Sequence, residues 1–96
     1  MKKELSDEKM HDLFEAIASL QNAEECREFF EDLCTVNELL AMRQLFWVAD
    51  LLNNHLVYTE IGEQTGASST TITRVNRCLS YGSGGYVKAL ERKNSK

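Results

Sequence analysis

The chain has 96 residues, of which 43% are hydrophobic and none is proline. This length suits a single globular domain over residues 1–96. The lack of proline and the small number of glycines favour an all-helical fold with short connections. No apolar run approaches the ~20 residues of a membrane span or resembles a signal peptide, so we expect a cytoplasmic protein with no membrane partner.

The net charge of −4 is unevenly distributed along the chain. Residues 1–66 carry fourteen acidic and five basic side chains, whereas residues 67–96 carry one acidic and six basic side chains. The C-terminal segment therefore has a formal charge of +5. A nucleic-acid partner is compatible with that segment, although the acidic total argues against one.

The cysteines and histidines do not suggest a metal site or an active site. Cys26, Cys34 and Cys78 are odd in number and lack C-x-x-C spacing, and the chain has only two histidines. We expect reduced, partly buried thiols and no metal. His55 fits the C-terminal end of a helix, and no nucleophile has a base at helical spacing, so we expect no enzymatic activity.

Three helices are predicted in the first half of the chain. Apolar residues at helical spacing indicate a first helix after Ser6, over about residues 7–20. Two patterns of a polar residue followed three positions later by glutamate predict the starts of two more helices. The pairs are Asn22 with Glu25 and Thr35 with Glu38, and the third helix is expected to end at about Asn53–Asn54.

The third helix, "VNELLAMRQLFWVADLLNN", has almost no polar face. A helix that is apolar all round is buried on all sides, and 96 residues provide little protein to surround it. A second copy of the chain would cover what the first cannot, so we predict an obligate homodimer. The alternative is a central helix surrounded by its own neighbours.

A helix-turn-helix motif is predicted over residues 58–80. Thr59 is a candidate N-cap of a short helix, and Ile61 and Thr65 lie on its inward side. Gly66 occupies the position where a tight turn requires positive φ, and Ser68 is expected to cap the next helix. In such a motif the second helix enters the major groove of double-stranded DNA.

The second helix of this motif has two distinct sides. Ile72, Val75 and Leu79 form an inward stripe, and the polar residues opposite are Ser69, Thr70, Thr73, Asn76 and Arg77. Hydroxyl and amide groups bond to base edges and phosphates, and arginine adds charge. The alternative is a polar helix face that only contacts solvent. Threonine is a poor helix former, so such a face would more commonly carry Glu, Lys or Gln.

Roles in DNA binding can be assigned to individual residues of this motif. Base contacts are expected from Ser69, Thr70 and Thr73. Phosphate contacts are expected from Tyr58, Thr59, Arg74, Arg77 and the backbone where the second helix starts, at Ser68 and Ser69.

Beyond this motif, Gly82 is expected to end the helix in the left-handed conformation. A short final helix follows, with Tyr86, Val87 and Leu90 facing the body of the protein. Its basic side chains, Lys88, Arg92, Lys93 and Lys96, extend the positive surface.

Several segments carry a family resemblance. "TGASSTTITR" and the apolar helix before it resemble the tryptophan repressor over residues 35–80. With "FFEDLCTVNEL" and "ASSTTITRVNRCLSYGSGGY", the chain more closely resembles the YerC/YecD group of the Trp repressor-like family. The resemblance implies about six helices in an intertwined homodimer with two DNA-reading heads. It also implies a sequence-specific transcriptional regulator, and a repressor.

The resemblance implies a possible effector site as well, because the tryptophan repressor grips its corepressor with a threonine and two arginines. Thr71 and Arg74 match on the recognition helix, but Gln44 or Leu45 stands in place of the second arginine, and Cys78 replaces a serine. Glutamine or leucine does not reproduce an arginine clamp, so tryptophan is not the expected effector. Either another small molecule binds at these five positions, or the protein binds DNA without a cofactor.

A different class of function remains open, in which the chain is a helical protein-interaction module without DNA binding. The docking surface would then be the acidic segment that contains Glu24, Glu25, Glu28, Glu31 and Asp32. The alternative for this segment is an ordinary solvated face.

Overall fold

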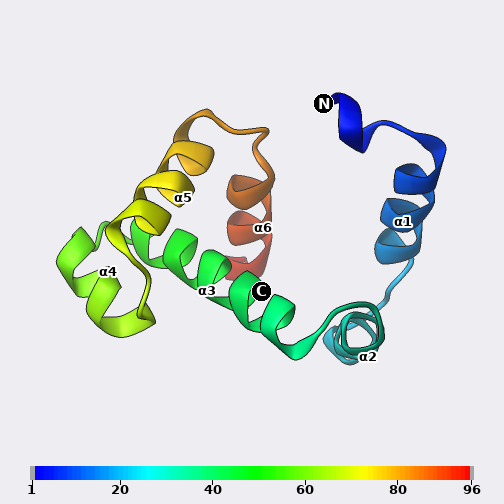
Figure 1. Cartoon of the computed structure of the whole chain (residues 1–96), viewed down its shortest axis with the longest axis horizontal. Coiled ribbons are helices and arrows are strands. Elements are labelled where there is room, and N and C mark those ends of the chain that lie inside the picture. The colour runs from blue at the N-terminus through cyan, green and yellow to red at the C-terminus, as the bar shows by residue number, and fades with distance from the viewer. Residues whose placement is uncertain (1, 96) are drawn as a thin grey trace. The chain divides into compact units, whose positions relative to one another are not determined.

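The computed structural model describes residues 2–95, and all regular structure in that range is helical. A short 3-10 helix, η1, and six α-helices follow one another along the chain (Figure 1). Their bounds are Lys3–Leu5 for η1, Glu8–Ala18 for α1, Ala23–Leu33 for α2, Val36–Asn53 for α3, Tyr58–Thr65 for α4, Ser69–Tyr81 for α5 and Gly85–Asn94 for α6. The predicted all-α class with about six helices is confirmed. The chain divides into two compact units, residues 1–39 and 40–96.

Side-chain caps define the helix starts in the N-terminal unit. The N-cap of α1 is Asp7 rather than Ser6, and its carboxylate accepts a hydrogen bond from the backbone N–H of Met10 at 2.7 Å. Asn22 caps α2 as predicted, because its Oδ1 accepts from the N–H of Glu25 at 2.8 Å. The sequence pattern therefore located both starts to within one residue.

The start of α3 is a reciprocal capping box, as predicted. The N–H of Thr35 donates to Glu38 Oε1 at 2.7 Å, and the N–H of Glu38 donates to Thr35 Oγ1 at 3.1 Å. The backbone hydrogen bond from Thr35, supported by its side chain, lowers the pKa of the Glu38 carboxyl group. Ionised Glu38 therefore stabilises this helix start.

The middle of α3 is only partly covered by the single chain. Val48 and Ala49 are fully buried. Leu40, Met42 and Trp47 are 43%, 45% and 38% exposed, respectively. The prediction that α3 is buried on all sides is therefore not met within one copy of the chain.

The ends of α3 and α4 differ in part from the predictions. His55 follows α3 with φ 65, so the histidine itself adopts the left-handed conformation that terminates the helix. The N-cap of α4 is Val57, which has no capping side chain. Thr59 lies inside the first turn, so the prediction that it caps this helix is wrong: α4 begins one residue before Thr59 and places Ile61 in the core.

The turn between α4 and α5 is fixed by short-range hydrogen bonds. Gly66 has φ 75, as predicted for this position. The hydroxyl of Thr65 donates to the carbonyl of Ile61 at 2.7 Å and accepts from the N–H of Ala67 at 3.1 Å. Ser68 caps α5 by accepting from the N–H of Thr71 at 3.2 Å. The turn therefore has its polar groups satisfied locally.

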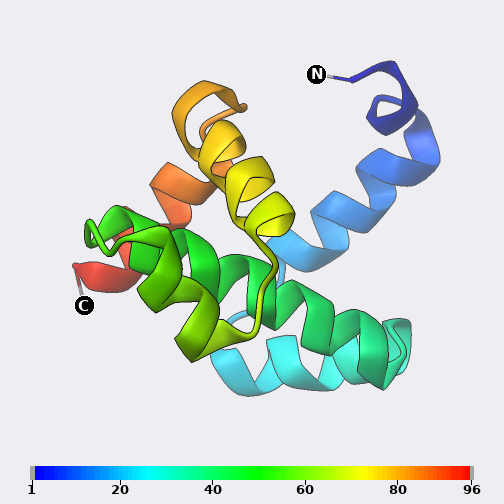
Figure 2. The same cartoon turned by 60° about the vertical axis from the view of Figure 1, so that its left-hand side comes forward.

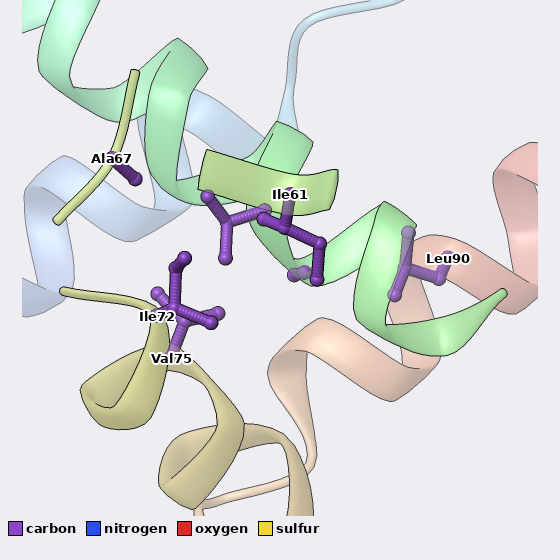
Figure 3. Packing of buried hydrophobic residues seen from close by; sticks show 7 residues of the cluster. Ile61, Ala67, Ile72, Val75 and Leu90 are labelled. Carbon is purple, nitrogen blue, oxygen red and sulfur yellow. The ribbon is translucent and has the colours of Figure 1, made fainter. Parts of the chain in front are cut away.

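The buried core of the C-terminal unit is shared by four helices and the turn. Figure 3 shows Ile61 of α4 next to Ile72 and Val75 of α5, with Ala67 of the turn and Leu90 of α6 at the edges. Val48 and Ala49 of α3 complete this cluster. Figure 2 shows α5 crossing over α3, with α4 along its side. This packing orients α5, because Ile72 and Val75 of its predicted inward stripe are each 1% exposed and the third member, Leu79, is partly buried against the core.

Two predictions for the segment from the end of α5 through α6 are wrong, and they concern Gly82 and Val87. Gly82 is extended, with φ −82 and ψ −161, and the left-handed glycine is Gly84, with φ 88, at the N-cap of α6. Gly82 is needed for a steric reason, since a Cβ there would lie 2.3 Å from the carbonyl oxygen of Cys78. In α6, Leu90 is buried as predicted, but Val87 is 39% exposed and does not face the core.

Candidate nucleic-acid interface

One side of α5 carries five of the predicted DNA-binding residues. They share a stripe because their spacing follows the helical repeat, and all five are exposed. They line an open depression of about 420 Å³, and we call them the polar face of α5: Ser69, Thr70, Thr73, Arg74 and Arg77. Hydroxyl groups occupy the N-terminal end of this face, and guanidinium groups follow.

The first turn of α5 offers backbone donors rather than the side chain of Ser68. The Ser68 hydroxyl accepts from the N–H of Thr71 and donates to Thr71 Oγ1 at 3.1 Å. Its one proton is therefore already used. The N–H groups of Ser69 and Thr70 lie in the first turn, where an α-helix has no partner for them. This helix start can donate to an anion through its backbone.

The arginines of the polar face carry charge that no neighbouring carboxylate neutralises. Throughout residues 2–95, ion pairs occur only between His11 and Glu15 and between Arg27 and its neighbours Glu24 and Glu31. All of these lie in the N-terminal unit. Arg74 and Arg77 are thus exposed cations available to an anionic partner.

The two predicted contacts on α4, Tyr58 and Thr59, are both exposed. The Nδ2 of Asn76 donates a hydrogen bond to the hydroxyl oxygen of Tyr58 at 3.1 Å. Asn76 is half-buried, so its predicted place among the exposed residues of α5 is wrong. Sequence reasoning missed this pair, because its members are 18 positions apart on different helices.

The five candidate effector residues have different environments. Gln44 Nε2 donates to the carbonyl oxygen of Thr65 at 3.2 Å, and Leu45 packs against the buried core. Thr71 belongs to the cap of α5. Two of the five, Arg74 and Cys78, are exposed, so Cys78 is not the partly buried thiol that was predicted.

The exposed pair lies near Tyr86 of α6. Burial raises the pKa of the Tyr86 phenol, the neighbouring Cys78 raises it further, and Arg74 lowers it. Three of the five candidate groups are therefore engaged within the protein, and the other two, Arg74 and Cys78, are exposed.

The part of the chain that the structure describes, residues 2–95, has neither a metal-binding cluster nor a membrane-spanning helix. No group of three or more histidine, cysteine, aspartate or glutamate residues in that range is arranged to hold a metal ion. In the same range, no helix has the length and apolar character needed to cross a membrane.

Comparisons with known proteins agree with this geometry. The sequence model of the Trp repressor protein family matches residues 8–94. The uncharacterized protein YerC of Bacillus subtilis (strain 168) is 46% identical over 88 residues, which cover 92% of this chain and 85% of YerC. The crystal structure of a TrpR-like protein from Eubacterium eligens ATCC 27750 is 46% identical, with a TM-score of 0.91 over 97% of this chain and 96% of that one. A candidate Trp repressor from Staphylococcus aureus is 40% identical, with a TM-score of 0.91 over 100% of this chain and 97% of that one. The chain therefore belongs to the Trp repressor family.

Proposed function

We propose that this protein is a homodimeric, sequence-specific DNA-binding repressor of transcription rather than an enzyme. The polar face of α5 carries this proposal, because it combines exposed hydroxyls with two unpaired arginines on a helix anchored by buried residues. Hydroxyl groups bond to base edges and phosphates, and arginine adds affinity for the backbone. Such a protein would act in the bacterial cytoplasm, where the chromosome lies.

Each residue of the interface has a proposed role. Ser69, Thr70 and Thr73 contact base edges from the N-terminal half of α5. The phosphate contacts come from Arg74, Arg77, Tyr58, Thr59 and the N–H groups at the Ser68–Ser69 helix start.

The dimer is proposed from the apolar side chains that α3 exposes. Leu40, Met42 and Trp47 are all more than a third exposed in the single chain. A second copy covering them would bury this apolar surface in an intertwined dimer. Two recognition helices would then meet half-sites about one helical turn, ~34 Å, apart on the DNA.

The dimer has its own test, which uses sedimentation of the purified protein. Trp47→Glu places a charge on the exposed part of α3 and is expected to shift the protein from dimer to monomer. Tyr81→Glu is the matched control, because Tyr81 is 89% exposed on α5. A wild-type protein that sediments as a monomer at micromolar concentration would contradict the dimer.

DNA binding is tested by selecting bound duplexes from a random pool. Thr73→Ala is expected to change the sequence preference, because it removes a hydroxyl from the proposed base contacts. Arg77→Ala is expected to weaken binding to all sequences alike and to reduce the slope of log affinity against log salt by about one. If the wild-type protein enriches no sequence and shifts no duplex at low salt, the proposed function is wrong.

We further propose that DNA binding does not require tryptophan. The amide of Gln44, at the position matched to a ligand-binding arginine, is already bonded to Thr65. Thr71 is likewise engaged with Ser68. The same selection is therefore run with and without amino acids and related metabolites. A consensus that appears only with one of them would identify an effector and contradict this part of the proposal.

The alternative is a helical protein-interaction module that docks through the acidic side of α2. Arg27 on that helix pairs with both Glu24 and Glu31, which reduces the net negative charge available there. A partner captured in the presence of nuclease and high salt, together with no DNA binding, would favour the alternative.

A further inference from the structure

The helix α4 is held by two long-range side-chain hydrogen bonds. Within residues 2–95, every other side-chain hydrogen bond joins residues at most four positions apart. The two exceptions are Gln44 with Thr65, which ties α4 to α3, and Asn76 with Tyr58, which ties it to α5. The second bond reaches a residue of the proposed DNA interface.

The direction of the Asn76–Tyr58 hydrogen bond leaves the phenolic proton of Tyr58 free. Asn76 Nδ2 is the donor and the Tyr58 hydroxyl oxygen is the acceptor, at 3.1 Å. A phenolic hydroxyl has a single proton, and accepting a bond from the amide does not use it. The amide occupies one side of the oxygen, so the O–H proton is directed away from Asn76. Tyr58 is 38% exposed, so solvent or a ligand can reach it.

Asn76 lies on the side of α5 that faces the core rather than on the polar face. By helical spacing it shares a side with Ile72, Val75 and Leu79. Ile72 and Val75 are buried, and Asn76 is half-buried beside them. Its amide is therefore available to α4 and is poorly placed to contact a base edge alongside Thr73.

We propose that Asn76 is a positioning residue that orients the Tyr58 hydroxyl to donate its proton to a DNA phosphate. This inference rests on the proposed function and deepens it, because it assigns to Asn76 an effect on DNA binding without contact to DNA. An O–H group that donates to a charged phosphate oxygen forms a charge-assisted bond, which is stronger than a neutral one. Fixing the rotor in advance removes the cost of ordering it when DNA binds.

The test is a double-mutant cycle in DNA affinity, measured by fluorescence anisotropy on a duplex recovered from the random pool. Tyr58→Phe is expected to weaken binding about 10-fold, because it removes a bond to a charged group. Asn76→Ala is expected to weaken it about 3-fold in the wild-type background and not at all in the Tyr58→Phe background. Tyr81→Phe is the matched control and should leave affinity unchanged, because that ring is 89% exposed and its hydroxyl has no partner within residues 2–95.

Thermal unfolding of the same variants separates positioning from loss of fold. If Asn76→Ala does not fold, Asn76→Leu replaces it, since leucine keeps the approximate volume without a donor. An effect that is only structural would follow the melting temperature and would persist in the Tyr58→Phe background. The positioning role predicts that the effect of Asn76 on affinity vanishes there, whatever the melting temperature does.

The possible results distinguish a failure of this inference from a failure of the proposed function. A wild-type protein that binds DNA, with Tyr58→Phe binding equally well, overturns the inference and leaves the proposed function intact. Equal losses for Asn76→Ala in both backgrounds would mean that Asn76 acts independently of Tyr58, which also overturns the inference. A wild-type protein that binds no duplex from the pool removes both the inference and the proposed function.

Discussion

Gln44 provides a sharp test of whether the DNA-binding head is ordered without a ligand. Its Nε2 donates to the carbonyl oxygen of Thr65 at 3.2 Å in a partly buried setting. Thr65 is the last residue of α4, so its carbonyl is one of those that the helix itself leaves without a partner. Gln44 therefore acts as a C-terminal cap supplied by α3.

The expected loss of stability in Gln44→Ala follows from the bond that is removed and the carbonyl that is left without a partner. Gln44→Ala removes this bond, which contributes about 0.5–1.5 kcal/mol net, and leaves the Thr65 carbonyl unsatisfied, which raises the cost to as much as about 3 kcal/mol. A central value of about 2 kcal/mol corresponds to a population of the locally opened turn about 30 times larger. The opening is expected to be confined to α4 and the turn, where stability depends on this bond.

The assay is amide hydrogen exchange at two positions of the turn. The N–H of Gly66 donates to the carbonyl of Gly62, and the N–H of Ala67 donates to the hydroxyl of Thr65. Both amides are expected to exchange about 30 times faster in Gln44→Ala, with no change in α2. Gln64→Ala is the matched control, because Gln64 is an exposed glutamine on α4. Equal exchange of Gln44→Ala and the wild type would refute the reasoning.

Four further predictions concern stability, measured by unfolding at a fixed protein concentration. Gly66→Ala should lower the free energy of unfolding by about 1–2 kcal/mol, because φ is 75 there although no atom lies within 4 Å of the added Cβ; Gly66→Asn should cost less. Gly82→Ala should also destabilise, but through the close approach to the Cys78 carbonyl, so Gly82→Asn should be no milder. Ile72→Ala removes a side chain that is 1% exposed and should cost about 2–5 kcal/mol. The pKa of Glu38 is lowered in the folded state, so the stability that ionised Glu38 contributes is present above its ordinary pKa of 4.5 and is lost as pH falls through the folded value. Glu38→Gln should remove this part of the pH dependence of the melting temperature. An unchanged pH profile would contradict the role of Glu38 in the capping box.

The features predicted correctly from the sequence are those set by local spacing. The cap at Asn22, the capping box of Thr35 and Glu38, the left-handed Gly66 and the cap at Ser68 each depend on residues at most three positions apart. Propensity and spacing describe such units fully.

The incorrect predictions concern backbone conformations and helix starts that depend on tertiary packing. Both Gly82 and Gly84 are able to adopt positive φ, and of the two only Gly84 does; Gly82 is extended and lies so close to the Cys78 carbonyl that a Cβ would not fit. Similarly, Val57 rather than Thr59 precedes α4, although threonine is the better cap. The start of α4 agrees with burial of Ile61, which contributes more than a cap.

The candidate interface also has a part that local spacing predicts and a part that depends on tertiary packing. The hydroxyl and arginine side chains of α5 share one face because of helical spacing, so the sequence was sufficient to group them. The bond between Asn76 and Tyr58 depends on how α4 and α5 cross, which no pattern within either helix specifies. The half-buried place of Asn76 follows from the same crossing.

The hydrogen bond between Gln44 and Thr65 also predicts the sign of regulation by a ligand that displaces it. Gln44 bonds to Thr65 and Thr71 bonds to Ser68, so these residues already fix both sides of the turn that precedes the polar face of α5. A small molecule that displaced the Gln44 amide from the Thr65 carbonyl would break this bond and would shift the protein toward a state in which the bond is open. Such a ligand would loosen α4 and weaken DNA binding. An effector that breaks the bond between Gln44 and Thr65 is therefore expected to release the protein from DNA, whereas a corepressor would tighten the complex.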